Sequence, residues 1–124
     1  MTEPKLTHDS TLRARLALET VQLGPHPGGS QRHIKALEGG DIRGLPTTRG
    51  EGMDASLVPG GSDRMLFDPT TNVAQIVVRT QGELSDRSPV LARYAGYLTM
   101  DKKAQQFMAH GPDARSTEFG DHHW

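Results

Sequence analysis

The chain contains no cysteine among its 124 residues. This absence excludes disulfide bonds and every zinc site that is built on thiolates. Aromatic residues are scarce as well, at 5%, and hydrophobic residues make up only 34% of the chain. So little apolar material in a chain of this length suffices for one small core. We therefore expect a flexible arm at residues 1–10 and a single domain over residues 11–124.

Long apolar runs are also missing from the sequence. No stretch approaches the roughly 20 apolar residues that a membrane-spanning helix needs. The first ten residues are polar and charged, and they lack the apolar segment of a secretory signal. We therefore expect a protein that has no membrane partner and resides in the cytoplasm.

Neither sign of charge dominates the chain. Lysine and arginine together number 14 and aspartate and glutamate 15, which gives a formal net charge of −1. The basic residues are spread along the sequence and form no run, whereas a nucleic-acid surface requires clustered lysine and arginine. The sequence therefore predicts no nucleic-acid partner.

Glycine and proline, in contrast, are abundant. The chain has 14 glycines and 8 prolines, residues that mark turns, so we expect many short elements. Between the turn signals, apolar and polar residues alternate with the period of two that is typical of half-buried strands. Expected strands cover residues 12–22, 32–37, 52–58, 63–67, 73–80 and 89–100. The first of these also contains good helix formers, but the later elements favour a strand.

The remaining segments are assigned as connections or left open. The pairs Gly39-Gly40 and Gly60-Gly61 predict breaks between strands, residues 68–72 a hairpin turn, and residues 81–88 a longer connection. Residues 101–110 fit a strand or a short helix, and residues 118–124 fit the start of a last strand. Many short strands without helices between them predict an all-β fold, namely an antiparallel β-barrel.

Motifs for cofactors and metals are absent. Neither glycine pair matches a phosphate-binding loop or a dinucleotide-binding fingerprint. The six histidines, at positions 8, 26, 33, 110, 122 and 123, do not form a pattern that would converge on one ion. We therefore expect neither a bound metal nor a cofactor.

A few polar residues stand where a barrel could use them. Asp63 follows a glycine pair, and it is either a turn acceptor or a site residue. Arg32 opens a strand as either an exposed charge or an anion contact. Tyr94 shares a strand face with Gly96 and is either a core tyrosine with a satisfied hydroxyl or a donor that lines a pocket. Arg93 and Tyr97 lie on the opposite face of the same strand.

Four short motifs follow one another in a fixed order: Arg32-His33-x-x-Ala36-Leu37-x-Gly39-Gly40, Val58-Pro59-Gly60-Gly61-Ser62-Asp63, Ser85-Asp86 and Val90-x-x-Arg93-Tyr94-x-Gly96. In order and spacing they resemble the domain-of-unknown-function family 3237, over about residues 12–124. The chain departs from the family pattern at several positions. These are His33 in place of a second arginine, Ala36 in place of proline, Arg64 in place of tryptophan, Thr80 in place of tyrosine and Arg87 in place of glycine.

The resemblance implies a barrel similar to those of allene oxide cyclase and dirigent proteins. It also implies a function, because some fungal relatives in pigment and flavonoid pathways of secondary metabolism are regarded as isomerases or cyclases. On this basis we expect a cofactor-free isomerase or cyclase for a small phenolic or polyketide-like compound. The expected catalytic residues are Arg32, His33, Asp63 and Tyr94, and the expected substrate-binding residues are Arg93, Gly96 and Tyr97. The alternative is a protein without catalysis, which binds a small hydrophobic ligand or serves as an oligomeric scaffold.

Family members usually continue past the tryptophan into a final strand, whereas this chain ends at Trp124. A barrel that lacks its closing strand exposes an unpaired edge, and a second subunit is the commonest way to cover one. We therefore expect a homo-oligomer, and the alternative is that the full protein continues beyond Trp124 and closes its own barrel.

Overall fold

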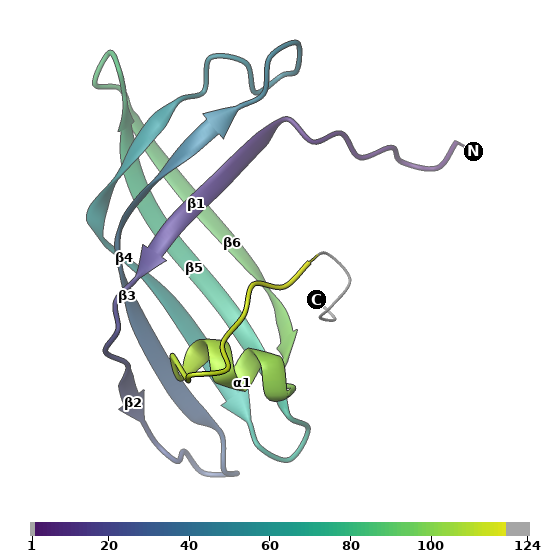
Figure 1. The fold of residues 1–124 in the computed structure, drawn as a ribbon, viewed down its shortest axis with the longest axis vertical. Coiled ribbons are helices and arrows are strands. Elements are labelled where there is room, and N and C mark those ends of the chain that lie inside the picture. Colours follow the sequence, from purple (N-terminus) through teal and green to yellow (C-terminus); the bar gives the residue numbers. More distant parts are fainter. Residues whose placement is uncertain (1, 119–124) are drawn as a thin grey trace.

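A computed structural model describes residues 2–118 of the chain. In this part of the chain it contains six strands and one helix (Figure 1). The elements are β1 (Ser10–Leu16), β2 (Val21–Leu23), β3 (Gln31–Gly44), β4 (Ala55–Asp68), β5 (Val73–Leu84), β6 (Pro89–Thr99) and α1 (Lys102–Met108).

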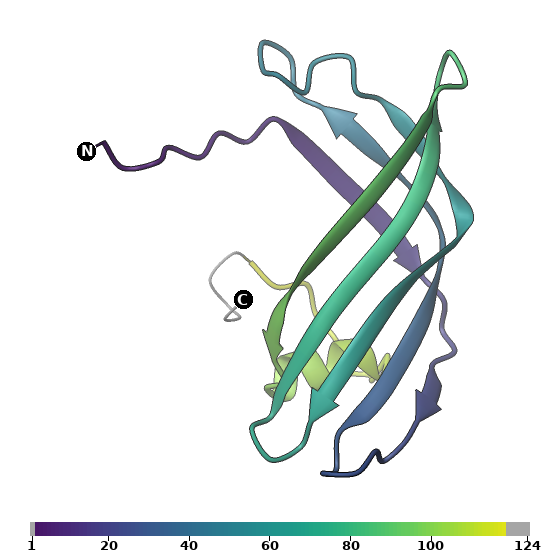
Figure 2. The same ribbon diagram turned by 180° about the vertical axis from the view of Figure 1, so that it is seen from behind.

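All the described strands belong to one antiparallel sheet. Its order is β1-β3-β4-β5-β6, and the short β2 pairs with the beginning of β3. The sheet curls strongly, and α1 lies across the lower part of its concave face (Figures 1 and 2). The predicted all-β, antiparallel, barrel-like fold is confirmed. We call the concave side the inner face of the sheet and the convex side its outer face.

The two glycine pairs do not end strands, and the predicted breaks at these positions are wrong. β3 continues through Gly39-Gly40, and β4 continues through Gly60-Gly61. Each pair lies in a β-bulge, where extra residues shift the pairing register while the strand goes on. The two bulges are neighbours, because Leu37, just before the first, pairs with Gly61 in the second.

Close approach of backbones explains why glycine is needed at these bulges. Gly40 has a φ of 142°, and a Cβ there would collide with the carbonyl oxygen of Arg13 on β1. A Cβ on Gly61 would lie 2.6 Å from the carbonyl oxygen of Arg79 on β5. Bulges and glycines in adjacent strands bend a sheet, so this line of contacts accounts for the curl.

Other boundaries also differ from the prediction. The strand expected at 12–22 is two strands, because β1 ends at Leu16 and β2 begins at Val21. The connection expected at 81–88 is shorter, since β5 runs on to Leu84. Of the two alternatives for residues 101–110 the helix is correct, and the Asp101 side chain caps α1 by accepting a 2.8 Å hydrogen bond from the Ala104 backbone N–H. The last strand expected at 118–124 lies almost wholly outside the described residues, and Glu118 itself is not in a strand.

The hairpin between β4 and β5 is confirmed. Its turn begins with Asp68, whose carboxylate accepts a 2.8 Å hydrogen bond from the Thr70 N–H. It ends at Asn72, which has a φ of 58°, a conformation that asparagine tolerates better than most residues. The predicted long strand at 89–100 is also confirmed, as β6.

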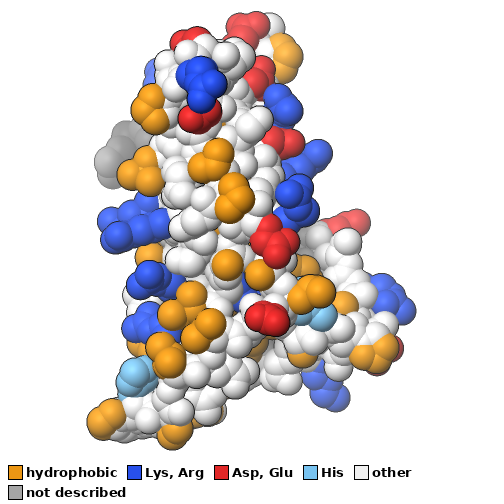
Figure 3. All heavy atoms as spheres, turned by 90° about the vertical axis from the view of Figure 1, so that its left-hand side faces the viewer, with side chains coloured by type: hydrophobic (Ala, Val, Ile, Leu, Met, Phe, Trp, Pro, Cys, Tyr) orange, Lys and Arg blue, Asp and Glu red, His pale blue; other side chains and the backbone are white. Residues whose placement is uncertain are grey.

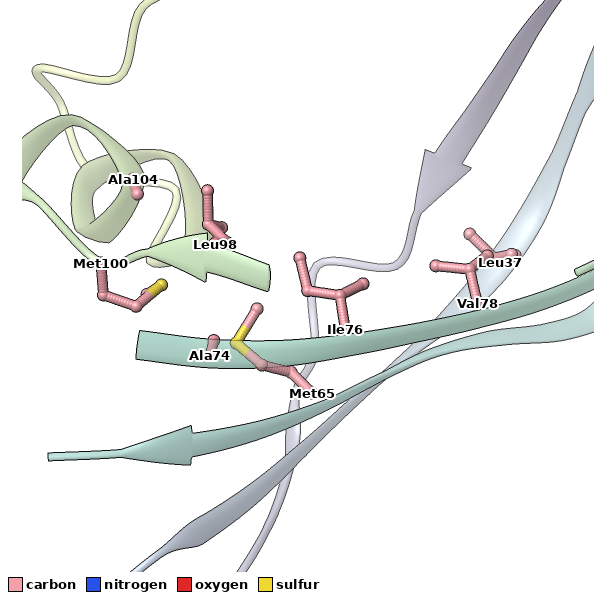
Figure 4. Close-up of a cluster of buried hydrophobic side chains, with 8 residues drawn as sticks. All are labelled: Leu37, Met65, Ala74, Ile76, Val78, Leu98, Met100 and Ala104. Carbon is pink, nitrogen blue, oxygen red and sulfur yellow. The ribbon is translucent and has the colours of Figure 1, made fainter. Parts of the chain in front are cut away.

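The hydrophobic core lies on the inner face, between the sheet and α1. Figure 4 shows the side chains of its main cluster, which are Leu37, Met65, Ala74, Ile76, Val78, Leu98, Met100 and Ala104. A smaller cluster of Ile42, Ala55 and Leu57 covers the same sheet near the β3–β4 loop. Buried polar side chains are few, and the charged one among them is Lys35.

The glycine contacts can be tested with Gly40→Ala and Gly29→Ala. Both positions have a positive φ, but a Cβ on Gly29 has no neighbour within 4 Å. Gly29→Ala therefore measures only the cost of placing alanine at a positive φ, which should lower the free energy of unfolding by about 1 kcal/mol or somewhat more. Gly40→Ala adds the collision with β1 and should cost clearly more in urea denaturation followed by circular dichroism. Equal losses in the two variants would contradict the role given to close packing.

Candidate functional site

The inner face carries a cavity of about 430 Å³. This volume falls in the range of small-molecule sites. The cavity is open on one side and is bordered by the sheet, by α1 and by the segment 115–117, and most of its wall is apolar. Its lining residues are Leu16, Asp63, Met65, Ile76, Val78, Tyr94, Ala95, Gly96, Leu98, Ala104, Phe107, Met108, Arg115, Ser116 and Thr117. We call it the inner cavity.

Two polar side chains of the cavity wall, those of Asp63 and Tyr94, come from one row across the sheet, whereas the other polar lining residues belong to the segment 115–117. Lys35 pairs with Asp63, Asp63 with Val78, and Val78 with Tyr94. Paired residues of adjacent strands point to the same face, so this row places a lysine, a carboxylate and a phenol on the inner face. Asp63 and Tyr94 are two strand spacings apart, about 10 Å between Cα atoms, which a small aromatic molecule could bridge.

Asp63 is the distinctive group of this row. It lies in the middle of β4 rather than in a turn, and its buried Oδ1 has no hydrogen-bond partner among the described residues. Burial raises the pKa of Asp63 above its ordinary value of 3.8, and the nearby charge of Lys35 partly opposes this effect. A carboxyl group with a raised pKa in the wall of an apolar cavity can exchange a proton with a bound molecule.

No pattern in the sequence predicts a role for Lys35. Its side chain is 2% exposed, and its ammonium group donates hydrogen bonds of 3.3 Å to the carbonyl oxygens of Ala17 and Leu18. The Nε2 atom of His110 lies 3.2 Å from the same nitrogen. Burial lowers the pKa of Lys35, while the charge of Asp63 works in the opposite direction. Lys35 thus connects β3 to the segment before β2 and to the turn after α1. It also places a positive charge on the strand next to Asp63.

Tyr94 and Gly96 shape the β6 side of the cavity. The Tyr94 side chain is half exposed, so it lines the cavity rather than filling the core. Burial, with the negative charge of Asp63 as a second cause, raises the pKa of Tyr94 above 10.0, so the phenol keeps its proton at neutral pH. A Cβ on Gly96 would meet no atom within 4 Å, which shows that this position faces open space.

The other predicted site residues lie apart from this row. His33 is on the inner face, but its ring packs beside Phe67, 6.4 Å between centroids, and it does not line the cavity. Burial lowers the pKa of His33. Arg32, Arg93 and Tyr97 alternate with inner-face residues of β3 and β6 and therefore project from the outer face. The structure thus brings Asp63, Tyr94 and Gly96 together and separates them from the predicted arginines.

Residues 2–118 show neither a metal-binding cluster nor a membrane-spanning helix. They contain no group of three or more histidine, aspartate or glutamate side chains that could hold a metal ion. Among them, no helix is long and apolar enough to cross a membrane.

The fold and the cavity define an all-β protein built on a single curled antiparallel sheet, with an apolar hollow on its concave side. The chain belongs to the protein family of unknown function DUF3237, whose model matches residues 4–123. No curated protein and no solved structure matches the chain. The predicted family membership is confirmed, and the finer likeness to allene oxide cyclase barrels stays a prediction.

We expect Asp63→Asn to raise the melting temperature at neutral pH. Because its pKa is raised in the folded protein, the stability contributed by the Asp63 proton is present at low pH and is lost as the pH rises through the folded-state pKa. Asparagine does not ionise, so the gain should appear above that pKa and vanish in acid. Thermal unfolding across this pH range checks it, with the exposed Asp54→Asn as control. A lower melting temperature at neutral pH would mean that the carboxylate is stabilised by its surroundings.

Proposed function

We propose that the protein is a cofactor-free isomerase or cyclase that closes a ring in a small phenolic or polyketide-like compound bound in the inner cavity. The observation that carries this proposal is the partly buried carboxyl group of Asp63 in the wall of an apolar cavity, with a protonated phenol on the same row. Ring closure of this kind needs positioning, one proton carrier and one hydrogen-bond donor, and it needs no cofactor.

The chemistry is illustrated by a hydroxychalcone, a phenol that carries a conjugated ketone. The Asp63 carboxylate accepts the phenolic proton, and the phenolate oxygen attacks the conjugated carbon. A C–O bond forms, and the electron pair of the C=C bond moves to give an enolate. Tyr94 donates a hydrogen bond to the enolate oxygen, and Asp63 returns the proton to the carbon next to the carbonyl. The product is an isomer of the substrate, so atoms and electrons balance.

The apolar wall contributes to the proposed reaction. Met65, Ile76 and Leu98 form part of it, and Phe107 of α1 approaches it from the other side. Water excluded by these side chains can no longer screen the developing enolate, so the hydrogen bond from Tyr94 and the charge of Lys35 act more strongly. Lys35 is a positioning residue in this scheme, because its ammonium group is already occupied by chain acceptors.

The catalytic role of Asp63 predicts loss of turnover in Asp63→Asn. With 2′-hydroxychalcone as the probe substrate, the absorbance of the conjugated ketone disappears on cyclisation to the flavanone. Loss of a positioned proton carrier should reduce the rate by a factor of about 10² to 10⁴. The control Asp54→Asn carries the same change at an exposed position and should keep the full rate. Unchanged turnover in Asp63→Asn would rule out the proposed role.

The alternative function, binding without catalysis, is supported by the predominance of apolar residues in the cavity wall. The variant Gly96→Val separates the two. Its side chain would enter open space, so the fold should be retained while the cavity becomes too small for the ligand. We expect loss of both binding and turnover, with Ala36→Val on the outer face of β3 as control. Binding of the chalcone that persists in Gly96→Val would exclude the inner cavity as its site.

If wild-type protein binds 2′-hydroxychalcone but leaves it unchanged, the binding function is the correct one.

The expected homo-oligomer stays a prediction. It is supported by the outer face of β6, where Leu91 is 76% and Tyr97 is 59% exposed.

A further inference from the structure

The outer face of the sheet has a groove of its own, of about 450 Å³. It lies over β3, β4 and β5 and reaches β6, on the side of the sheet away from α1. Its lining residues are Arg32, Gly60, Gly61, Ser62, Arg64, Val77, Arg79, Gln81 and Leu91. We call it the outer groove.

The arginines of this groove form a diagonal line across neighbouring strands. Arg32 on β3 pairs with Leu66, which is two residues from Arg64 on β4. Arg64 pairs with Val77, which is two residues from Arg79 on β5. Such diagonal neighbours share a face and have Cα atoms about 7–8 Å apart, so three long side chains can reach one ligand.

A fourth arginine extends the line, because Arg93 on β6 pairs directly with Arg79. Figure 3 views the molecule from the side of β3 and β4, and it shows basic side chains following one another down one side of the surface without an acidic side chain between them.

None of the ion pairs between described residues neutralises this charge. The lining residues include no aspartate or glutamate. Within residues 2–118, the ion pairs join Arg43 to Asp41 and Arg87 to Glu83, and neither involves an arginine of the groove. Like charges directly opposite each other in a sheet are destabilising, as for Arg79 and Arg93. The chain as a whole has a net charge of −1, so this cluster does not follow from a general excess of basic residues.

The bulge of β4 provides the floor of the groove. Gly60 and Gly61 have no side chains to fill it, and Gly60 adopts a φ of 119°. Polar groups border this floor, because Arg64 Nε donates a 3.3 Å hydrogen bond to Ser62 Oγ and Gln81 Nε2 donates a 3.4 Å hydrogen bond to the carbonyl oxygen of Pro59. Val77 and Leu91 add apolar surface beside the arginines.

We propose that the outer groove binds an organic phosphate, namely a phosphate monoester with a small apolar group. A carboxylate offers two acceptor oxygens and a single charge, which leaves part of three guanidinium groups without an acceptor. A phosphate monoester offers three oxygens and nearly two charges, and it matches the forked geometry of arginine. Val77 and Leu91 would contact the apolar group. This site is separate from the inner cavity and does not rest on the function proposed for it.

Calorimetric titration of the full chain with phenyl phosphate tests the proposal. We expect saturable one-to-one binding that weakens as salt is added, because the contacts are exposed and charged. The double variant Arg64→Gln/Arg79→Gln should weaken binding by about tenfold or more, the scale of lost charged hydrogen bonds. The control Arg49→Gln removes an exposed loop arginine and should bind as the wild type does. Because the replaced side chains are exposed, all variants should melt as cooperatively as the wild type.

Two comparison ligands, benzoate and inorganic phosphate, test separately the need for the phosphate group and for the apolar group. Weaker binding of benzoate supports the requirement for a phosphate, and weaker binding of inorganic phosphate supports the contact with Val77 and Leu91. Equal binding of inorganic and phenyl phosphate would overturn the assignment of an organic ligand. Absence of phenyl phosphate binding at millimolar concentration, or equal binding by the double variant, would overturn the site itself. Asp63→Asn should bind phenyl phosphate normally, so failure of this proposal and failure of the proposed catalysis can be distinguished.

Discussion

Contact between backbones, made where side chains are absent, determines the shape of this protein. Gly40 lies against the carbonyl of Arg13, Gly61 against that of Arg79, and a Cβ on Gly82 would collide with the carbonyl of Ser56. Two of these glycines lie in bulges, and all three lie where adjacent strands press together. The resulting bend turns one face of the sheet into a concave wall for the core and the inner cavity. On the convex side, the same bulge of β4 leaves the floor of the outer groove without side chains.

The charged row of the inner face follows from this curvature. Lys35 is buried because the chain before β2 and the turn after α1 both come close enough to supply acceptors for its ammonium group. Those acceptors satisfy the lysine, so it has no need of an ion pair with Asp63. Among the described residues the carboxylate therefore keeps a buried oxygen without a hydrogen-bond partner, which costs stability.

Much of the fold could be predicted from the sequence, because alternating polarity and turn residues act locally. The hairpin at Asp68–Asn72 and the face of β6 that carries Tyr94 and Gly96 were predicted in this way. The glycine pairs were misread, since a bulge and a turn have the same local composition. Only the pairing of Leu37 with Gly61, which are distant in the sequence, distinguishes the two.

The residues of the candidate sites were harder to predict than the strands, because contacts between distant parts of the chain bring them together. The acceptors of Lys35 are contributed by residues 17, 18 and 110, which no local pattern connects to position 35. The groove arginines stand at positions 32, 64 and 79, so a search for basic runs cannot detect them. Sheet topology brings them together. The sequence pointed to Asp63 because it follows a glycine pair. That pair was expected to form a turn, whereas in the structure it lies in a β-bulge.

The alternation of side chains along β4 also explains how one strand can serve two independent sites. Ser62 and Arg64 contribute to the outer groove, while Asp63 between them contributes to the inner cavity. The charge that acts on the pKa of Asp63 is that of Lys35, on the neighbouring strand, and not that of Arg64, its neighbour in the chain. Lys35 shares the buried inner face, whereas the guanidinium group of Arg64 projects into water, which screens its charge. Neutralising the groove arginines should therefore leave the proton affinity of Asp63 nearly unchanged, so the two faces can be altered separately.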